Sequence, residues 1–132
     1  MKEKALGNIN VAQLLLNKSG ECYSNTSVHC SYYAVFQYMK YILAKTDKMP
    51  ISYEDQDSKQ GVDSHNFILE EVKKRIDNTT NKRRFAQQVR LLRNSRIRAD
   101  YKSEVIMQNE GLECKQQAEA CISKLKQFFG NI

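Results

Sequence analysis

The sequence predicts an all-α protein, an antiparallel up-and-down four-helix bundle with an additional short helix. Apolar residues recur at the 3.6-residue period of an α-helix in every long segment, and no pair of strand-like segments competes with this pattern. The chain has one proline and five glycines, so few residues interrupt the helices. Its 132 residues are enough for one domain, residues 1–132, with a single hydrophobic core.

The first predicted helix is short and lies within residues 8–20, NINVAQLLLNKSG. Asn8 or Asn10 can cap its start, because an asparagine side chain accepts a hydrogen bond from the free N–H groups of the first turn. Gly20 can end it, because glycine tolerates the left-handed backbone that often follows a helix.

The second predicted helix covers residues 25–45, with Thr26 or Ser27 as its N-cap. Its apolar face continues over the whole length at the helical period. This face consists of Val28, Tyr32, Val35, Met39, Ile42 and Leu43.

A polar connection, residues 46–61, comes next and contains the only proline, Pro50. A loop of this length in a compact domain is typically mobile or functional. The third helix is expected to begin near Asp63 or Ser64, either of which can cap it. Its predicted inward residues are Phe67, Ile68, Val72 and Ile76.

The fourth predicted helix runs from near Lys82 to Tyr101, after a break at residues 77–81, DNTTN. Its inward residues are expected to be Phe85, Val89, Leu92 and Ala99. The last helix lies within residues 112–129. Its predicted inward residues are Leu112, Ala118, Ile122, Leu125 and Phe129.

The positive charge of the protein is concentrated in the fourth predicted helix. Residues 82–98 hold seven basic side chains and no acidic one. The other positions hold 14 basic and 15 acidic side chains, a net charge of −1, whereas the whole chain carries +6. Such a local positive potential is typical of a surface that binds nucleic acid or another phosphate-bearing ligand; a solvated basic face without a ligand is the alternative.

The composition favours a cytoplasmic protein with no membrane partner. No apolar run approaches the roughly 20 residues that span a bilayer. The segment MKEKALGNIN at the start lacks the apolar stretch of a signal peptide.

The four cysteines could form two disulfides or contribute to a zinc site. No two of them have Cys-x-x-Cys spacing, and the chain has only two histidines. We therefore expect reduced cysteines that act as small hydrophobic residues, and neither a metal nor a cofactor. The cysteines are Cys22, Cys30, Cys114 and Cys121.

Arg96 falls on the inward stripe of the fourth helix, where the period calls for an apolar side chain. Asp100 is within i,i+4 reach of it, and Tyr32 carries a hydroxyl that needs a partner when buried. We expect these three residues to form a partly buried cluster, because a buried guanidinium needs charged or hydrogen-bonded partners. Arg96 is then either an architectural clamp between two helices or a phosphate ligand at the edge of a cleft. A guanidinium sealed from solvent would exclude the second role.

Short motifs occur in a characteristic order along the chain: CSYYAVFQYMKYIL (residues 30–43), DSHNFI (63–68), and RIRADYKSEV (96–105) followed by KQQAEACISKLKQFF (115–129). Together they resemble the HEPN-domain family of helical bundles, in particular a small single-domain prokaryotic branch with YYAxF and RxxADY motifs. The resemblance spans roughly residues 9–129.

This resemblance implies a bundle that forms homodimers and partners a small nucleotidyltransferase in two-gene toxin–antitoxin modules. Many members are metal-independent ribonucleases whose site is an Arg-x4-6-His motif. The window after Arg93 or Arg96 contains no histidine here, since positions 98 and 101 are arginine and tyrosine. These residue types have unperturbed pKa values far above neutrality, so neither replaces imidazole as a general base. The catalytic residues are therefore unassigned.

The two histidines lie elsewhere. His29 is on the flank of the second helix, where we expect a partly exposed ring. His65 is in the first turn of the third helix, whose positive end favours the neutral imidazole, and it can pack beneath the long loop. The resemblance also implies that Tyr101 is a candidate for modification by the partner enzyme, as a nearby tyrosine is in some relatives.

Three functions follow from these observations. The first is binding of RNA or nucleotide phosphates by the basic helix. The second is a catalytically silent dimeric interaction protein whose arginines form salt bridges, and the third is a ribonuclease that uses His29 or His65. The candidate phosphate ligands are Arg90, Arg93, Arg96 and Arg98, and the supporting polar cluster comprises Tyr32, Asp100 and Tyr101.

Overall fold

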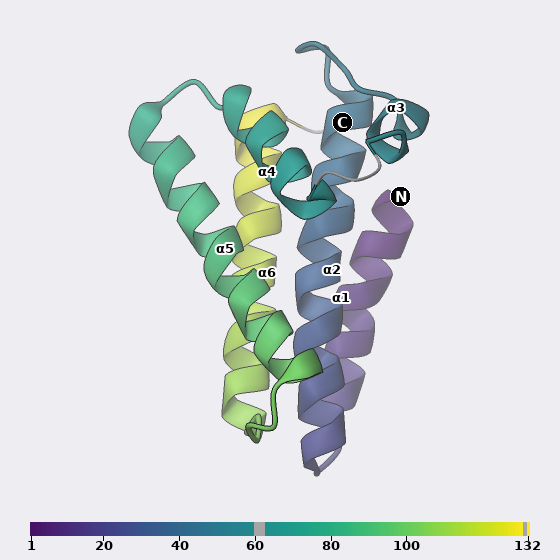
Figure 1. Cartoon of the computed structure of the whole chain (residues 1–132), viewed down its shortest axis with the longest axis vertical. Helices are drawn as coiled ribbons and strands as arrows, with labels where there is room; N and C mark the ends of the chain where they lie inside the picture. The colour runs from purple at the N-terminus through teal and green to yellow at the C-terminus, as the bar shows by residue number, and fades with distance from the viewer. Residues whose placement is uncertain (60–62, 131) are drawn as a thin grey trace.

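The computed structural model of this chain describes residues 1–59, 63–130 and 132. Within these ranges the backbone forms six α-helices and no β-strand (Figure 1). The helices are α1 (Lys2–Leu16), α2 (Glu21–Lys45), α3 (Tyr53–Asp57), α4 (Ser64–Lys74), α5 (Thr79–Tyr101) and α6 (Gln108–Phe129). The prediction of an all-α protein is confirmed. None of the helices described is both long enough and apolar enough to cross a membrane.

The four longest helices lie along the long axis of the molecule and alternate in direction (Figure 1). In this view the chain descends through α1, rises through α2, descends through α5 and rises through α6. The short helices α3 and α4 lie in the upper part, where the chain passes from α2 to α5. α2 is the central element, because it packs against α1, α4, α5 and α6.

The composition of α2 explains its central place. All six residues of its predicted apolar face are buried, which confirms the prediction. On the side toward α1 the contact is close, because Ala5 and Ala12 of α1 are fully buried and have small side chains. There the Ser27 hydroxyl donates a hydrogen bond to the carbonyl oxygen of Ala12 at 2.9 Å.

The predicted start of the first helix is wrong. α1 begins at Lys2, so neither Asn8 nor Asn10 caps it. The amide of Asn8 instead donates to Oε1 of Gln37 on α2 at 2.9 Å. Packing of the N-terminal turns against α2 outweighs the weak local start signals, a tertiary effect that no cap motif reports.

The predicted N-cap of the second helix is also wrong. α2 begins at Glu21 and its N-cap is Gly20, nearly two turns before Thr26 and Ser27, so Gly20 starts α2 rather than ending α1. Gly20 has a φ of 129°, a conformation that side chains other than glycine rarely adopt, so its glycine character serves the turn between the two helices.

The connection after α2 is more structured than predicted. It contains α3, which Ser52 caps by accepting a hydrogen bond from the backbone N–H of Asp55. The buried guanidinium of Arg75 holds the start of this connection, because it donates to the carbonyl oxygens of Lys48 and Met49 at 2.8 and 2.6 Å. Residues 60 and 61 of the predicted connection lie outside the described ranges.

The helices that carry the site agree more closely with their sequence signals. Asp63 caps α4, as predicted, and accepts from the N–H of Asn66. α5 begins at Thr79, slightly before the predicted start, and all four of its predicted inward residues are buried. On α4, Ile68 and Val72 are buried and Phe67 is partly buried, and Ile76, which follows the end of α4, is also buried.

In α6 one inward prediction is wrong. Leu112 is 42% exposed, because α6 begins at Gln108 and the buried position of this turn is Gly111. Gly111 packs so closely on α1 that an added Cβ would lie 2.7 Å from Cδ2 of Leu16. All four cysteines are free thiols, and all except Cys22 are buried, in line with the prediction. Burial raises the pKa of the Cys121 thiol to about 12.

Candidate functional site

Arg96 occupies the predicted inward position on α5 and is only 5% exposed. Its guanidinium lies against two rings of α2, with its central carbon 5.3 Å from the ring centroid of Tyr32 and 5.5 Å from that of Tyr33. The ring of Tyr101 lies 5.9 Å from the same carbon. The charge is compensated by Asp100, whose Oδ2 lies 3.6 Å from Nη1 of Arg96. Aromatic faces and a carboxylate together stabilise a cation that has lost most of its water.

This burial decides the role of Arg96. A guanidinium sealed in this way, with its fork turned onto rings and a carboxylate of the same chain, is not placed to meet a phosphate. The architectural alternative therefore agrees with the geometry: Arg96 clamps α5 to α2.

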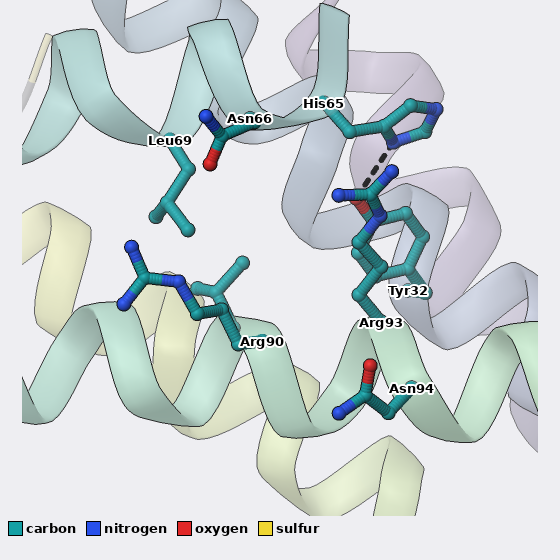
Figure 2. Close-up of a pocket in the computed structure, with 8 residues that line it drawn as sticks. Tyr32, His65, Asn66, Leu69, Arg90, Arg93 and Asn94 are labelled. Carbon is teal, nitrogen blue, oxygen red and sulfur yellow. Dashed lines mark hydrogen bonds between the residues drawn. The ribbon is translucent and has the colours of Figure 1, made fainter. Parts of the chain in front are cut away.

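The hydroxyl of Tyr32 has a different partner from the one predicted. It lies 2.7 Å from Nδ1 of His65 on α4, not against Asp100 or Arg96 (Figure 2). Burial raises the pKa of Tyr32, so the phenol keeps its proton and donates it to Nδ1. The imidazole is then neutral with its hydrogen on Nε2.

The surroundings of His65 favour the expected neutral form. Burial lowers the pKa of His65, and the nearby guanidinium groups of Arg93 and Arg96 lower it further. The ring packs on Phe36 of α2, with the ring centroids 4.4 Å apart. Loss of hydration, followed by the two positive charges, thus favours the uncharged imidazole.

His29 also belongs to this region. Its Nδ1 lies 2.8 Å from Oδ2 of Asp100, and its ring centroid lies 4.7 Å from that of Tyr33. His29 is partly exposed, as expected. The ring of Tyr33 lies near both histidines, since its centroid is also 5.9 Å from that of His65. The sequence does not predict this convergence, because His29 and His65 come from different helices.

A cavity of about 230 Å³ lies between α4 and α5 beside this cluster (Figure 2). Figure 2 shows Asn66 of α4 and Arg90 and Asn94 of α5 around this space, with the second ring nitrogen of His65 turned away from it. The lining residues are Tyr32, His65, Asn66, Leu69, Val89, Arg90, Arg93 and Asn94. We call this cavity the α4–α5 pocket.

Each guanidinium of the α4–α5 pocket is paired with a carboxylate of α4 or its cap. Arg93 donates to both oxygens of Asp63 at 3.2 Å, and Arg90 donates to Oε1 of Glu70 at 2.8 Å. The hydrogen bond from the backbone N–H of Asn66 lowers the pKa of Asp63, and Arg93 lowers it further, so this carboxylate stays charged. Both carboxylates are partly exposed, and solvent-accessible pairs of this kind contribute about 0–1 kcal/mol each.

The two remaining predicted residues lie away from the α4–α5 pocket. Arg98 pairs with Glu110 of α6, and its Nε lies 3.2 Å from Glu104 in the α5–α6 connection. Tyr101 ends α5 with its side chain 74% exposed. Of the four predicted phosphate ligands, the structure brings Arg90 and Arg93 to one cavity and leaves the other two in structural ion pairs.

Sequence reasoning missed Asn66 and Asn94, which complete the pocket lining. Their signal is positional, since Asn94 follows Arg90 by one helical turn and Asn66 follows the Asp63 cap by three residues.

Comparison of this chain with protein-family models, with curated proteins and with solved structures finds no match.

Proposed function

We propose that this protein is a HEPN-like, up-and-down four-helix bundle with additional short helices that binds phosphate groups of RNA or nucleotides in the α4–α5 pocket. The observation that supports this proposal is the convergence of two guanidinium groups and two side-chain amides, those of Arg90, Arg93, Asn66 and Asn94, on one open cavity. Guanidinium groups bind phosphate through two parallel hydrogen bonds, and amide N–H groups add further donors.

The carboxylates of the pocket act as competitors for a ligand. Asp63 and Glu70 are partly exposed, so their pairs with Arg93 and Arg90 are weak and open to exchange with solvent. A phosphate carries up to two negative charges and offers more acceptor oxygens than a carboxylate. We infer that a phosphate replaces Asp63 on the Arg93 fork.

Binding fits this site better than cleavage. A general base must come within hydrogen-bond reach of the group it deprotonates. The Nδ1 atom of His65 is occupied by Tyr32, and its other ring nitrogen is turned away from Arg90 and Arg93 (Figure 2). We therefore propose the binding, toxin-like component of a cytoplasmic two-gene module, acting as a homodimer with a nucleotidyltransferase partner.

The test measures binding of a fluorescently labelled single-stranded RNA by anisotropy at several salt concentrations. Phosphate contacts release counterions, so affinity should fall with salt, and the slope should decrease by about two when two contacts are removed. The variant is R90Q/R93Q, and the control K18Q/K102Q removes the same charge from exposed positions that do not line the pocket. Equal affinity and slope for R90Q/R93Q and wild type would contradict the proposal.

The second candidate function is a catalytically silent dimeric interaction protein. It is favoured by the ion pairs of Arg90, Arg93, Arg96 and Arg98, all of which meet carboxylates of the same chain. Light scattering on wild type and Arg96→Ala distinguishes the candidates. A dimer that binds no RNA at low salt, and that Arg96→Ala dissociates, would favour this second function over phosphate binding.

A further inference from the structure

We propose a second, separate anion site in the groove between the first half of α5 and the last half of α6, which binds a nucleotide through its phosphate. The groove has a cavity of about 200 Å³. It is lined by Asn81, Arg84, Phe85, Gln88, Lys124 and Phe128. None of these residues lines the α4–α5 pocket, so this site stands or falls independently of the function proposed above.

The lining residues are regularly spaced on two antiparallel helices. On α5, Asn81, Arg84 and Gln88 recur once per turn and so share one face. On α6, Lys124 and Phe128 are also one turn apart. The start of α5 and the end of α6 both lie in the upper half of the molecule, which brings the two faces together (Figure 1).

The floor and one wall of the groove are aromatic. Phe85 is 2% exposed and forms part of the core, whereas Phe128 is only partly buried. The two rings meet edge to face, with their centroids 6.3 Å apart. Phe128 therefore presents apolar surface to the groove beside the two cationic groups.

The charge of this groove differs from that of the α4–α5 pocket. Within the part of the chain that the structure describes, Arg84 and Lys124 form no ion pair with a carboxylate, whereas Arg90 and Arg93 each do. The sequence explains the difference, since residues 78–99 and 120–132 contain no aspartate or glutamate. The two helix segments that form the groove thus leave its positive potential without local compensation.

The chemistry of the groove matches an organic phosphate better than a simple ion. Arg84 and Lys124 supply charged donors for phosphate oxygens, the amides of Asn81 and Gln88 supply neutral ones, and Phe128 offers a surface for a base. Sites that enclose a drug-sized ligand measure roughly 300–1,000 Å³. This smaller groove suits a phosphate with its base against an open wall, in a free nucleotide or in single-stranded RNA.

The experiment titrates the full chain with AMP, with inorganic phosphate and with a short single-stranded RNA, followed by calorimetry and by backbone amide NMR shifts. Wild type should bind AMP more tightly than inorganic phosphate, with shifts centred on residues 81–88 and 124–128. R84Q/K124Q should weaken AMP binding at least about tenfold, because the loss of one charge-assisted hydrogen bond is expected to raise the Kd by about that factor. K18Q/K102Q should bind AMP as wild type does, and Phe128→Leu should narrow the gap between AMP and phosphate. RNA that binds while AMP does not would assign the groove to polymeric ligands.

Two results would overturn this site. Equal AMP and RNA affinity for R84Q/K124Q and wild type would remove it, as would AMP that binds no more tightly than inorganic phosphate while RNA binds R84Q/K124Q as it binds wild type. The variant R90Q/R93Q separates this site from the proposed function. If only R90Q/R93Q loses ligand, the ligand occupies the α4–α5 pocket and the groove is not a site; if only R84Q/K124Q does, the groove is the site and the pocket is not.

Discussion

The Oδ2 atom of Asp100 lies 2.8 Å from Nδ1 of His29, which joins the last turn of α5 to the first half of α2. The same oxygen lies 3.6 Å from Nη1 of Arg96. One carboxylate therefore compensates a buried guanidinium and ties two helices together, so changes around it should affect stability.

Asp100→Asn should destabilise the protein by about 1–3 kcal/mol, because it leaves the buried Arg96 without its charged partner. Urea unfolding measures this change in the free energy of unfolding. Asp57→Asn is the matched control, since Asp57 pairs with Lys40 while its side chain is 67% exposed, and its loss should cost less than about 1 kcal/mol. Equal effects of the two substitutions would contradict the role assigned to Asp100.

Arg96→Ala should destabilise more than Arg96→Met. Both substitutions remove the ion pair, but methionine retains contact with the rings of Tyr32 and Tyr33. Alanine instead leaves a cavity. Replacing a large buried apolar side chain by alanine lowers the free energy of unfolding by about 2–5 kcal/mol. Thermal melting of both variants against wild type tests this order. Equal destabilisation by the two substitutions would show that the lost charge, not packing, dominates at this position.

Stability should decline as pH falls from 7 toward 5. The folded-state pKa of His65 is lowered from 6.5, so the unfolded chain takes up its proton first and unfolding becomes easier in acid. Between the lowered folded-state pKa and 6.5 the free energy of unfolding therefore rises with pH, and this contribution is complete above 6.5. Urea unfolding at several pH values should show a shallower decline in the free energy of unfolding for His65→Gln than for wild type. His29→Gln, which retains His65, should show the same decline as wild type. An undiminished decline in His65→Gln would assign the effect to another group.

Asp63→Asn should increase the affinity of the α4–α5 pocket for phosphate ligands. Asparagine caps a helix as well as aspartate does, so α4 should remain intact while Arg93 loses its competing carboxylate. Removing the exposed Asp63–Arg93 ion pair is expected to increase the affinity for phosphate ligands by up to about fivefold. Asp77→Asn removes the same charge from an exposed site paired with Lys48 and serves as the control in the anisotropy assay. Unchanged or weaker binding by Asp63→Asn alone would argue against competition in the pocket.

Gly111→Ala should stabilise the protein less than Gly7→Ala does, because its Cβ would lie 2.7 Å from Cδ2 of Leu16 and this side chain would have to shift, which offsets the gain in helix propensity. Gly7→Ala in α1 is the opposite case. Nothing lies within 4 Å of a Cβ there, so alanine should stabilise the helix by about 0.5–1 kcal/mol. Differential scanning calorimetry of both variants measures the contrast, and a stabilisation as large in Gly111→Ala as in Gly7→Ala would contradict the close approach at Gly111.

Some features of the site could be predicted because their causes are local. The period of α5 places Arg96 on the inward face and Asp100 one turn away, and the cap residue Asp63 marks the start of α4. Each depends on backbone geometry within a few residues, so position in the sequence is enough to predict it.

Other features depended on contacts between distant segments. The partner of Tyr32 is His65, 33 positions away, and Arg93 meets Asp63 across 30 positions. The helical period predicts which face a side chain occupies, but not which side chain of another helix lies opposite it. The start of α1 belongs to the same class, since burial of Ala5 against the rest of the core extends the helix to Lys2.

By itself, the sequence determined that this protein is helical, which faces turn inward, and that one of those faces carries a charged residue. Only the tertiary structure decided that this residue is buried between two helices. It also decided which of the other arginines form ion pairs with carboxylates and which do not. The physical reason is range: helix periodicity and capping act over a single turn, whereas charge compensation and burial depend on how separate helices pack.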